Sequence, residues 1–156
     1  MTRGNDDKVL TGSCLCRGVR FEIRGPFLRA SHCHCSRCRK HSGAGASTQG
    51  RVLPEQLSVV AGKDLVRIFK PAPDAVVKAF CSVCGSSLFG GGYPGGPEIA
   101  VRFGALDGDP GIRPQFRQWV DSMASWDAIT DDLPQYAEGW SAEAQPKPRR
   151  QGGPGR

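Results

Sequence analysis

Stretches of alternating apolar and polar residues recur along the first two thirds of the chain and predict β-strands. Residues 19–24 show the pattern best, because Val19, Phe21 and Ile23 alternate with charged residues, as in a strand with one buried face. Glycine and proline interrupt these stretches at short intervals, which is typical of strands joined by turns. Further strands are predicted over residues 57–61, 65–69, 75–80, 87–89 and 99–103.

Three of these predicted strands follow one another with only turn sequences between them. Gly62-Lys63-Asp64 separates the first two, and the sequence Pro-Ala-Pro-Asp over residues 71–74 separates the second from the third. This arrangement predicts an antiparallel meander over residues 57–80. We therefore expect a mainly β fold that is small and antiparallel and is built from hairpins, with few short helices.

The length of 156 residues predicts one domain with a core of its own. We expect a flexible N-terminus over residues 1–8, one folded domain over residues 9–141 and a disordered basic tail over residues 142–156. The net charge at pH 7 is +6, and the last ten residues contribute four of these charges, which leaves +2 for the rest. Such a nearly balanced body disfavours a dedicated nucleic-acid partner.

The sequence shows neither the apolar core of a signal peptide near its start nor an apolar run long enough to cross a membrane. Its seven cysteines are odd in number and lie in closely spaced groups, unlike the scattered cysteines of secreted disulfide-bonded domains. We therefore expect a cytoplasmic protein with reduced thiols and no membrane partner.

Three cysteines and three histidines crowd into residues 31–41. The spacing Cys-x-Cys-x-x-Cys lets one tight loop, leading into a short helical turn, direct three sulfurs at one point, as tetrahedral zinc requires. The alternative is a set of reduced cysteines packed as small apolar residues, which the neighbouring histidine and arginine residues disfavour. The cysteines are Cys33, Cys35 and Cys38, and the histidines are His32, His34 and His41.

The seven sulfurs divide most simply as four plus three, giving two zinc ions per chain. A structural zinc ion takes four protein ligands, whereas a catalytic one commonly keeps three and an open position. Two alternatives stay open: the cysteines divide differently, or a histidine, with His41 the best placed, closes the second site. The predicted ligands are Cys14, Cys16, Cys81 and Cys84 for the structural zinc, and Cys33, Cys35 and Cys38 for the catalytic zinc.

An open site with three thiolates fits thiol chemistry. Its ion is a weak Lewis acid, but it is well suited to bind a fourth thiol as thiolate. Arg37, Arg39 and Lys40 either hold carboxylates of an anionic thiol or form a solvated cationic face. The alternative function is a non-catalytic zinc module that binds a protein or nucleic acid, and the oligomeric state stays open.

Two other interpretations of the cysteines are excluded or disfavoured. Zinc nucleobase deaminases need His-x-Glu and Pro-Cys-x-x-Cys, but His34 is followed by Cys35 and Ser36, and Phe80 precedes the later pair. A thioredoxin-like role for that pair requires a βαβ setting, and the surrounding sequence predicts antiparallel strands.

All three tryptophans, Trp119, Trp126 and Trp140, lie between residues 114 and 140, together with Phe116 and Tyr136. We expect an aromatic layer that closes the sheet. A ligand pocket is the alternative, and the two are compatible.

Three runs of sequence resemble the glutathione-dependent formaldehyde-activating enzyme family, to which centromere protein V also belongs. They are residues 12–22, 33–40 and 80–89, followed by late landmarks at residues 104–107, Trp119, residues 125–126 and residues 132–134. Arg17 departs from the pattern, because many relatives have glycine at this position.

The resemblance implies a β-tent zinc fold with the same two zinc sites as the division above. It also implies condensation of formaldehyde with glutathione to S-(hydroxymethyl)glutathione, an activity classed as a carbon–sulfur lyase in the reverse direction. On this expectation Cys33, Cys35 and Cys38 carry the reactive zinc, and glutathione is the first candidate for the thiol partner.

Overall fold

The computed structural model describes residues 8–148. Most of the predicted flexible N-terminus, residues 1–7, lies outside the described residues, as does the predicted basic tail from residue 149 onward. Residues 142–148 are described, and among them the Lys147 N–H donates to the Gln135 carbonyl oxygen. No helix within residues 8–148 has both the length and the apolar character needed to cross a membrane.

Within these residues the chain forms ten strands, one α-helix and four short 3-10 turns, which confirms the mainly β prediction. The strands are β1 (Val9–Ser13), β2 (Arg20–Arg24), β3 (Arg29–Cys33), β4 (Ser47–Val52), β5 (Leu57–Ala61), β6 (Val66–Phe69), β7 (Val77–Cys81), β8 (Ser87–Gly91), β9 (Ile99–Arg102) and β10 (Phe116–Gln118). The helix is α1 (Ser36–Ser42), and the turns are η1 (Pro54–Gln56), η2 (Lys63–Leu65), η3 (Phe103–Ala105) and η4 (Val120–Ser122).

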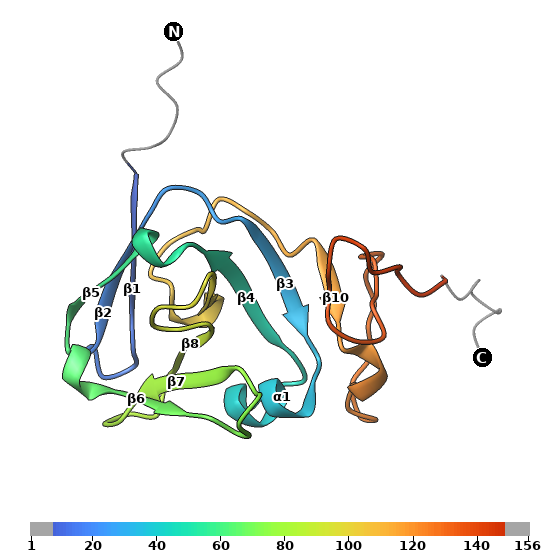
Figure 1. The fold of residues 1–156 in the computed structure, drawn as a ribbon, viewed down its shortest axis with the longest axis horizontal. Coiled ribbons are helices and arrows are strands. Elements are labelled where there is room, and N and C mark those ends of the chain that lie inside the picture. Colours follow the sequence, from blue (N-terminus) through green and yellow to red (C-terminus); the bar gives the residue numbers. More distant parts are fainter. Residues whose placement is uncertain (1–7, 149–156) are drawn as a thin grey trace, which may run out of the picture.

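The strands form two sheets. One has three strands in the order β1-β2-β5, and the other has seven in the order β10-β3-β4-β9-β8-β7-β6. Neighbouring strands run antiparallel except β10 and β3, which run parallel. Figure 1 shows the small sheet on one side, with β3 and β4 on the other and β6 and β7 along the base.

The hydrophobic core lies where the two sheets face each other. Phe21 of β2 meets Phe89 of β8 edge to face with ring centroids 5.0 Å apart, and Tyr93 stacks on Phe89 at 4.7 Å. All three side chains are buried, and full burial of a phenylalanine contributes about 1.5–3 kcal/mol. The alternation over residues 19–24 therefore marks the core face of β2, as predicted.

The predicted meander is wrong in its first pairing. β6 and β7 pair antiparallel as expected, but β5 pairs with β2 in the three-stranded sheet. The connection is the cause, because Gly62 has φ +67° and the 3-10 turn η2 follows it. This segment carries the chain across to the second sheet, whereas a hairpin would return it alongside β5.

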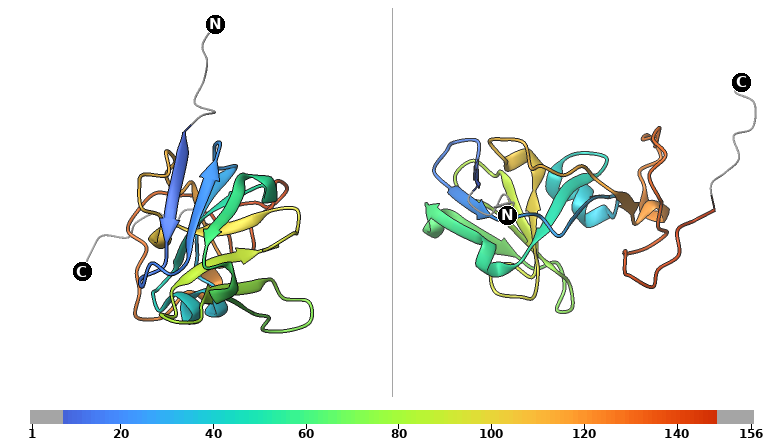
Figure 2. Two further views of the ribbon diagram at one scale, coloured as in Figure 1. Left: turned by 90° about the vertical axis from the view of Figure 1, so that its left-hand side faces the viewer. Right: turned by 90° about the horizontal axis from the view of Figure 1, so that it is seen from above.

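The segment after β10 extends away from the two sheets (Figure 2) and contains the tryptophans and the tyrosine of the predicted layer. Trp140 stacks on Phe116 of β10 at 5.2 Å, and Tyr136 meets Phe116 edge to face at 5.7 Å. Trp126 is instead largely exposed. The aromatic layer therefore forms against β10 from Phe116, Tyr136 and Trp140, whereas Trp119 and Trp126 are exposed.

Candidate metal centres

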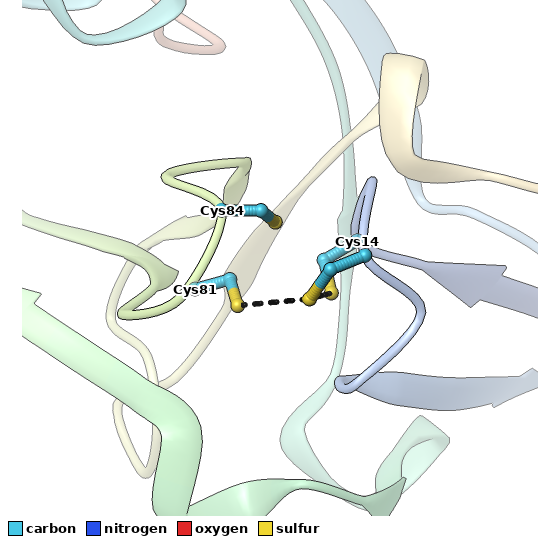
Figure 3. Close-up of side chains that lie close together, drawn as sticks. Cys14, Cys81 and Cys84 are labelled. Atoms are coloured by element: carbon cyan, nitrogen blue, oxygen red, sulfur yellow. Dashed lines mark hydrogen bonds between the residues drawn. The ribbon is translucent and has the colours of Figure 1, made fainter.

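Four cysteines from distant parts of the chain meet between the sheets. Each of these residues offers one sulfur, and the four sulfurs all lie within 4.8 Å of one another; Figure 3 shows three of the residues labelled, with their sulfurs facing a common space. The turn after β1 provides two of them, and the end of β7 with the following turn provides the other two. This four-cysteine cluster consists of Cys14, Cys16, Cys81 and Cys84.

Two tight turns position these sulfurs. Gly85 has φ +76°, and its N–H donates to the Cys81 carbonyl oxygen at 2.8 Å, which closes the second turn. In the first turn Arg17 has φ +62°, a conformation that favours glycine. Arginine in place of glycine at residue 17 therefore raises the conformational energy of the turn, but the four cysteines still converge. The Leu15 N–H donates to Ser86 Oγ at 2.9 Å and links the two turns.

The other three cysteines come from one continuous segment, and their sulfurs also lie within 4.8 Å of one another. Cys33 ends β3, and Cys35 caps α1 by accepting a hydrogen bond from the Cys38 N–H at 3.3 Å. Because Cys38 lies in the first turn of the helix, the cap brings it back beside the strand end. Cys33 and Cys38 are buried. We call Cys33, Cys35 and Cys38 the three-cysteine cluster.

The three histidines have other partners. His34 is fully buried, and Arg117 Nη1 lies 3.0 Å from its Nε2. Thr48 Oγ1 lies 2.9 Å from His32 Nδ1, and Ser87 Oγ lies 2.8 Å from His41 Nδ1. Within the described residues no histidine joins the group of sulfurs, so the geometry gives no support to closure by His41.

Both clusters fit zinc by their donors. Convergent cysteine sulfurs are the soft ligands that zinc prefers, and the backbone supports them. For example, the Val19 N–H donates to Cys14 Sγ at 3.2 Å. The four-cysteine cluster would bind zinc with all four coordination positions filled by protein. The three-cysteine cluster would leave one coordination position open for another ligand.

Two buried cations from distant strands lie beside the three-cysteine cluster. Lys78 of β7 donates to Cys38 Sγ at 3.2 Å, and Arg102 of β9 donates to Ser47 Oγ at 3.0 Å. Hydrogen bonds from Cys33 and Cys35 lower the pKa of Cys38, and the charges of Lys78 and Arg102 lower it further. The two cations therefore favour negative charge on the sulfurs of this cluster.

Strand register places these cations on one face of the seven-stranded sheet. Residues directly opposite on neighbouring strands share a face. The register pairs Cys33 with Ser47, Ser31 with Gln49, Gln49 with Arg102, Ala100 with Gly90 and Gly90 with Lys78. We call the face that carries Ser31, Cys33, Ser47, Gln49, Lys78 and Arg102 the polar face.

The cations singled out in the sequence lie elsewhere. Arg37 and Lys40 are exposed on α1, and Arg39 donates to the carbonyl oxygens of His34 and Ser122, each at 3.2 Å. Lys78 and Arg102 were not predicted as site residues. Each lies in a predicted strand, where a charged side chain is expected to point to solvent. Their sequence signal is a lone cation inside an otherwise apolar stretch.

A cavity of about 530 Å³ adjoins the polar face. Arg102 and Ser47 belong to its lining, together with the hydroxyl-bearing residues Ser42 and Ser87, and Cys14 borders it from the other cluster. This volume is within the usual range for small-molecule sites.

Comparisons with known proteins agree with this architecture. A crystal structure of a Rhodobacter sphaeroides protein superposes with a TM-score of 0.54 at 24% identity, covering 64% of this chain and 89% of that one. A Halomonas elongata relative named for the glutathione-dependent formaldehyde-activating enzymes is 33% identical over 107 residues, which is 65% of this chain and 68% of the relative.

An Aspergillus flavus relative with the same family name is 39% identical over 79 residues, which is 49% of this chain. The match spans only 41% of that relative's length. The sequence model of the family, described as glutathione-dependent formaldehyde-activating enzyme, matches residues 9–122. The prediction from the three cysteine-bearing runs is confirmed, and the chain belongs to the glutathione-dependent formaldehyde-activating enzyme family.

Proposed function

We propose that the protein is a zinc-dependent enzyme of the carbon–sulfur lyase type that joins a small thiol, with glutathione as the first candidate, to formaldehyde. The product with glutathione would be S-(hydroxymethyl)glutathione. The observation that carries the proposal is the three-cysteine cluster, in which three sulfurs converge on a sheet face that carries two buried cations, Lys78 and Arg102. Arg102 also lines the cavity. The family match supports the same substrates.

Zinc held by Cys33, Cys35 and Cys38 would supply thiol activation, because coordination to zinc deprotonates a thiol at neutral pH. The protein's own residues then have separate tasks. Lys78 donates to Cys38 Sγ and offsets negative charge on the sulfurs. The cavity beside the polar face admits the thiol, and the buried strands keep the cluster in a fixed geometry.

The net reaction needs no further reactant. The thiol sulfur forms a bond to the carbonyl carbon, the carbonyl π bond breaks, and the proton of the thiol ends on the carbonyl oxygen. Holding the thiol near the aldehyde supplies proximity. We assign the four-cysteine cluster a structural role, because it joins the turn after β1 to the end of β7 and so connects the two sheets.

Exchange NMR on a mixture of glutathione and formaldehyde tests this proposal. The interconversion rate is measured without protein, with the zinc-loaded protein, and with Cys38→Ser at matched zinc occupancy of the four-cysteine cluster. We expect acceleration by the wild type alone. Equal rates in all three samples would overturn the formaldehyde assignment.

We also propose a cytoplasmic location, where a reducing environment keeps cysteines as free thiols. The seven cysteines form no disulfide.

A further inference from the structure

The polar face carries more positive charge than its neighbours neutralise. Lys78 is 3% exposed and Arg102 is 4% exposed. Their hydrogen bonds go to Cys38, Ser47 and Gln49, none of which is a carboxylate. Burying a cation without an anionic partner is costly. Lys78 faces the sulfur of Cys38, whereas the partners of Arg102 are neutral, so the surroundings of Arg102 favour an anion.

Arg102 is fixed in place but has hydrogen-bonding capacity left over. Its Nη1 donates to Ser47 Oγ at 3.0 Å and to Gln49 Oε1, which orients the guanidinium plane. Its Nε is buried and has no partner among the described residues. A guanidinium has five N–H donors in a planar fork that matches a carboxylate.

The sequence leaves room for this guanidinium at one position of β8. A Cβ atom on Gly90 would lie 2.8 Å from Arg102 Nη2, closer than real Cβ atoms approach. Glycine at residue 90 therefore lets Arg102 extend across the strand toward β7. Gly90 lies inside β8, so no turn requires glycine at this position. A small residue is needed because the Arg102 side chain occupies the adjacent space.

The same side chain connects the cavity with the three-cysteine cluster. Arg102 lines the cavity, and Ser47, which accepts its hydrogen bond, lies directly opposite Cys33 in the strand register. The acid in the cavity lining is Asp107, which is exposed and accepts a hydrogen bond from Ser13 Oγ at 2.6 Å. Burial, together with Arg102 and Lys78, lowers the pKa of His41 to about 4, so His41 adds no positive charge near pH 7.

We propose that Arg102 is the residue that binds a carboxylate of the thiol substrate, and that it selects anionic thiols over neutral ones. This inference rests on the proposed function, because it takes a thiol as the ligand of the three-cysteine cluster. Three thiolates on a zinc ion carry a net charge of −1, which Lys78 offsets. Arg102 is then the cation of the cavity lining that is available to the substrate, and it has the role that the sequence suggested for Arg37, Arg39 and Lys40.

The experiment compares glutathione with its diamide, in which both carboxylates are replaced by neutral amides. Binding to the zinc-loaded full-length protein is measured by titration calorimetry without formaldehyde, and exchange rates are measured with formaldehyde. We expect the wild type to bind glutathione about tenfold to a hundredfold more tightly than the diamide, as for a hydrogen bond to a charged group. The two monoamides identify which carboxylate is bound.

Three variants assign the preference to its residue. Arg102→Gln is expected to bind both thiols equally, Arg102→Lys to keep part of the preference, and Arg37→Gln, on exposed α1, to keep all of it. Loss of the preference in Arg37→Gln with its retention in Arg102→Gln would overturn the proposal. If Arg102→Gln does not fold, the wild type and Arg102→Lys test the proposal instead. Equal binding of glutathione and its diamide by the wild type would also overturn the proposal.

Failure of this inference is distinguishable from failure of the proposed function. Preferential binding of glutathione that depends on Arg102, without acceleration of the formaldehyde reaction, supports the carboxylate site and refutes the enzyme assignment. Equal acceleration with glutathione and its diamide supports the enzyme and refutes the carboxylate site.

Discussion

The two cysteine clusters begin with the same Cys-x-Cys spacing but place the middle residue in opposite environments. Leu15, between Cys14 and Cys16, is 84% exposed, whereas His34, between Cys33 and Cys35, is fully buried. The first turn lies at the surface and meets a second turn from far along the chain. The second starts from β3, which has a neighbouring strand on each side, and enters a helix. The same local spacing therefore brings sulfurs together in both clusters. The burial of the residue between them depends on where the preceding strand lies in the fold.

The clusters also differ in charge and in what they connect. The four-cysteine cluster joins two turns through backbone and hydroxyl contacts, such as Leu15 N–H to Ser86 Oγ. The three-cysteine cluster comes from one segment and gains Lys78 and Arg102 from other strands. We infer that the first contributes mainly to stability and the second to chemistry, a division that mutation of each cluster tests.

The largest expected effect is the loss of stability in Cys81→Ser. Cys81 is fully buried and contributes one of two sulfurs from the β7 side, so its loss weakens the link that the cluster makes between the sheets. Loss of a structural metal is among the changes that cost more than about 4 kcal/mol. Thermal unfolding with metal analysis measures it.

Cys38→Ser is the matched variant for that measurement. It should lose one equivalent of zinc and the exchange activity, while its melting temperature stays well above that of Cys81→Ser. A collapse of stability in Cys38→Ser equal to that in Cys81→Ser would show that both clusters are structural and would end the division.

A smaller effect is expected from Lys78→Met. This change removes the donor to Cys38 Sγ, so the sulfurs lose a partner that offsets their charge. Such supporting partners typically contribute about tenfold to a hundredfold in metal affinity. Competition with a chromophoric chelator should show weaker zinc binding at one site of the two. Lys70→Met, which alters an exposed lysine, is the control, and an equal loss at both sites would contradict the assignment.

The sequence predicted the sulfurs and the core strands well for a physical reason. Zinc ligands must come from chemically distinctive residues at short spacings, and strands such as β2 show their buried face by alternation. β3 and β4 were not predicted, because their buried residues include Ser31, Ser47 and Gln49. A strand that buries polar side chains has no hydrophobic alternation to detect.

A different cause, long separation in sequence, explains why the cations beside the three-cysteine cluster were not predicted. Lys78 and Arg102 are brought to Cys38 by strand order and register, which link β7, β8, β9 and β4 across the sheet. Neither residue is close in sequence to the three-cysteine cluster, so no local pattern predicts the contact. Arg37, Arg39 and Lys40 were favoured only because they are neighbours in sequence.

The smallest expected effect tests the residue between the paired ligands. Leu15→Gln changes an exposed side chain, so we expect the free energy of unfolding to change by less than about 0.5 kcal/mol. His34→Gln disturbs the contact with Arg117, which also holds Asp131, and should destabilise the protein by about 1 kcal/mol, the usual contribution of one hydrogen bond. Denaturant unfolding of the two variants under identical zinc loading measures both values. Equal costs would mean that the Cys-x-Cys turns are equivalent despite their different burial, and the comparison between the clusters would then rest on charge alone.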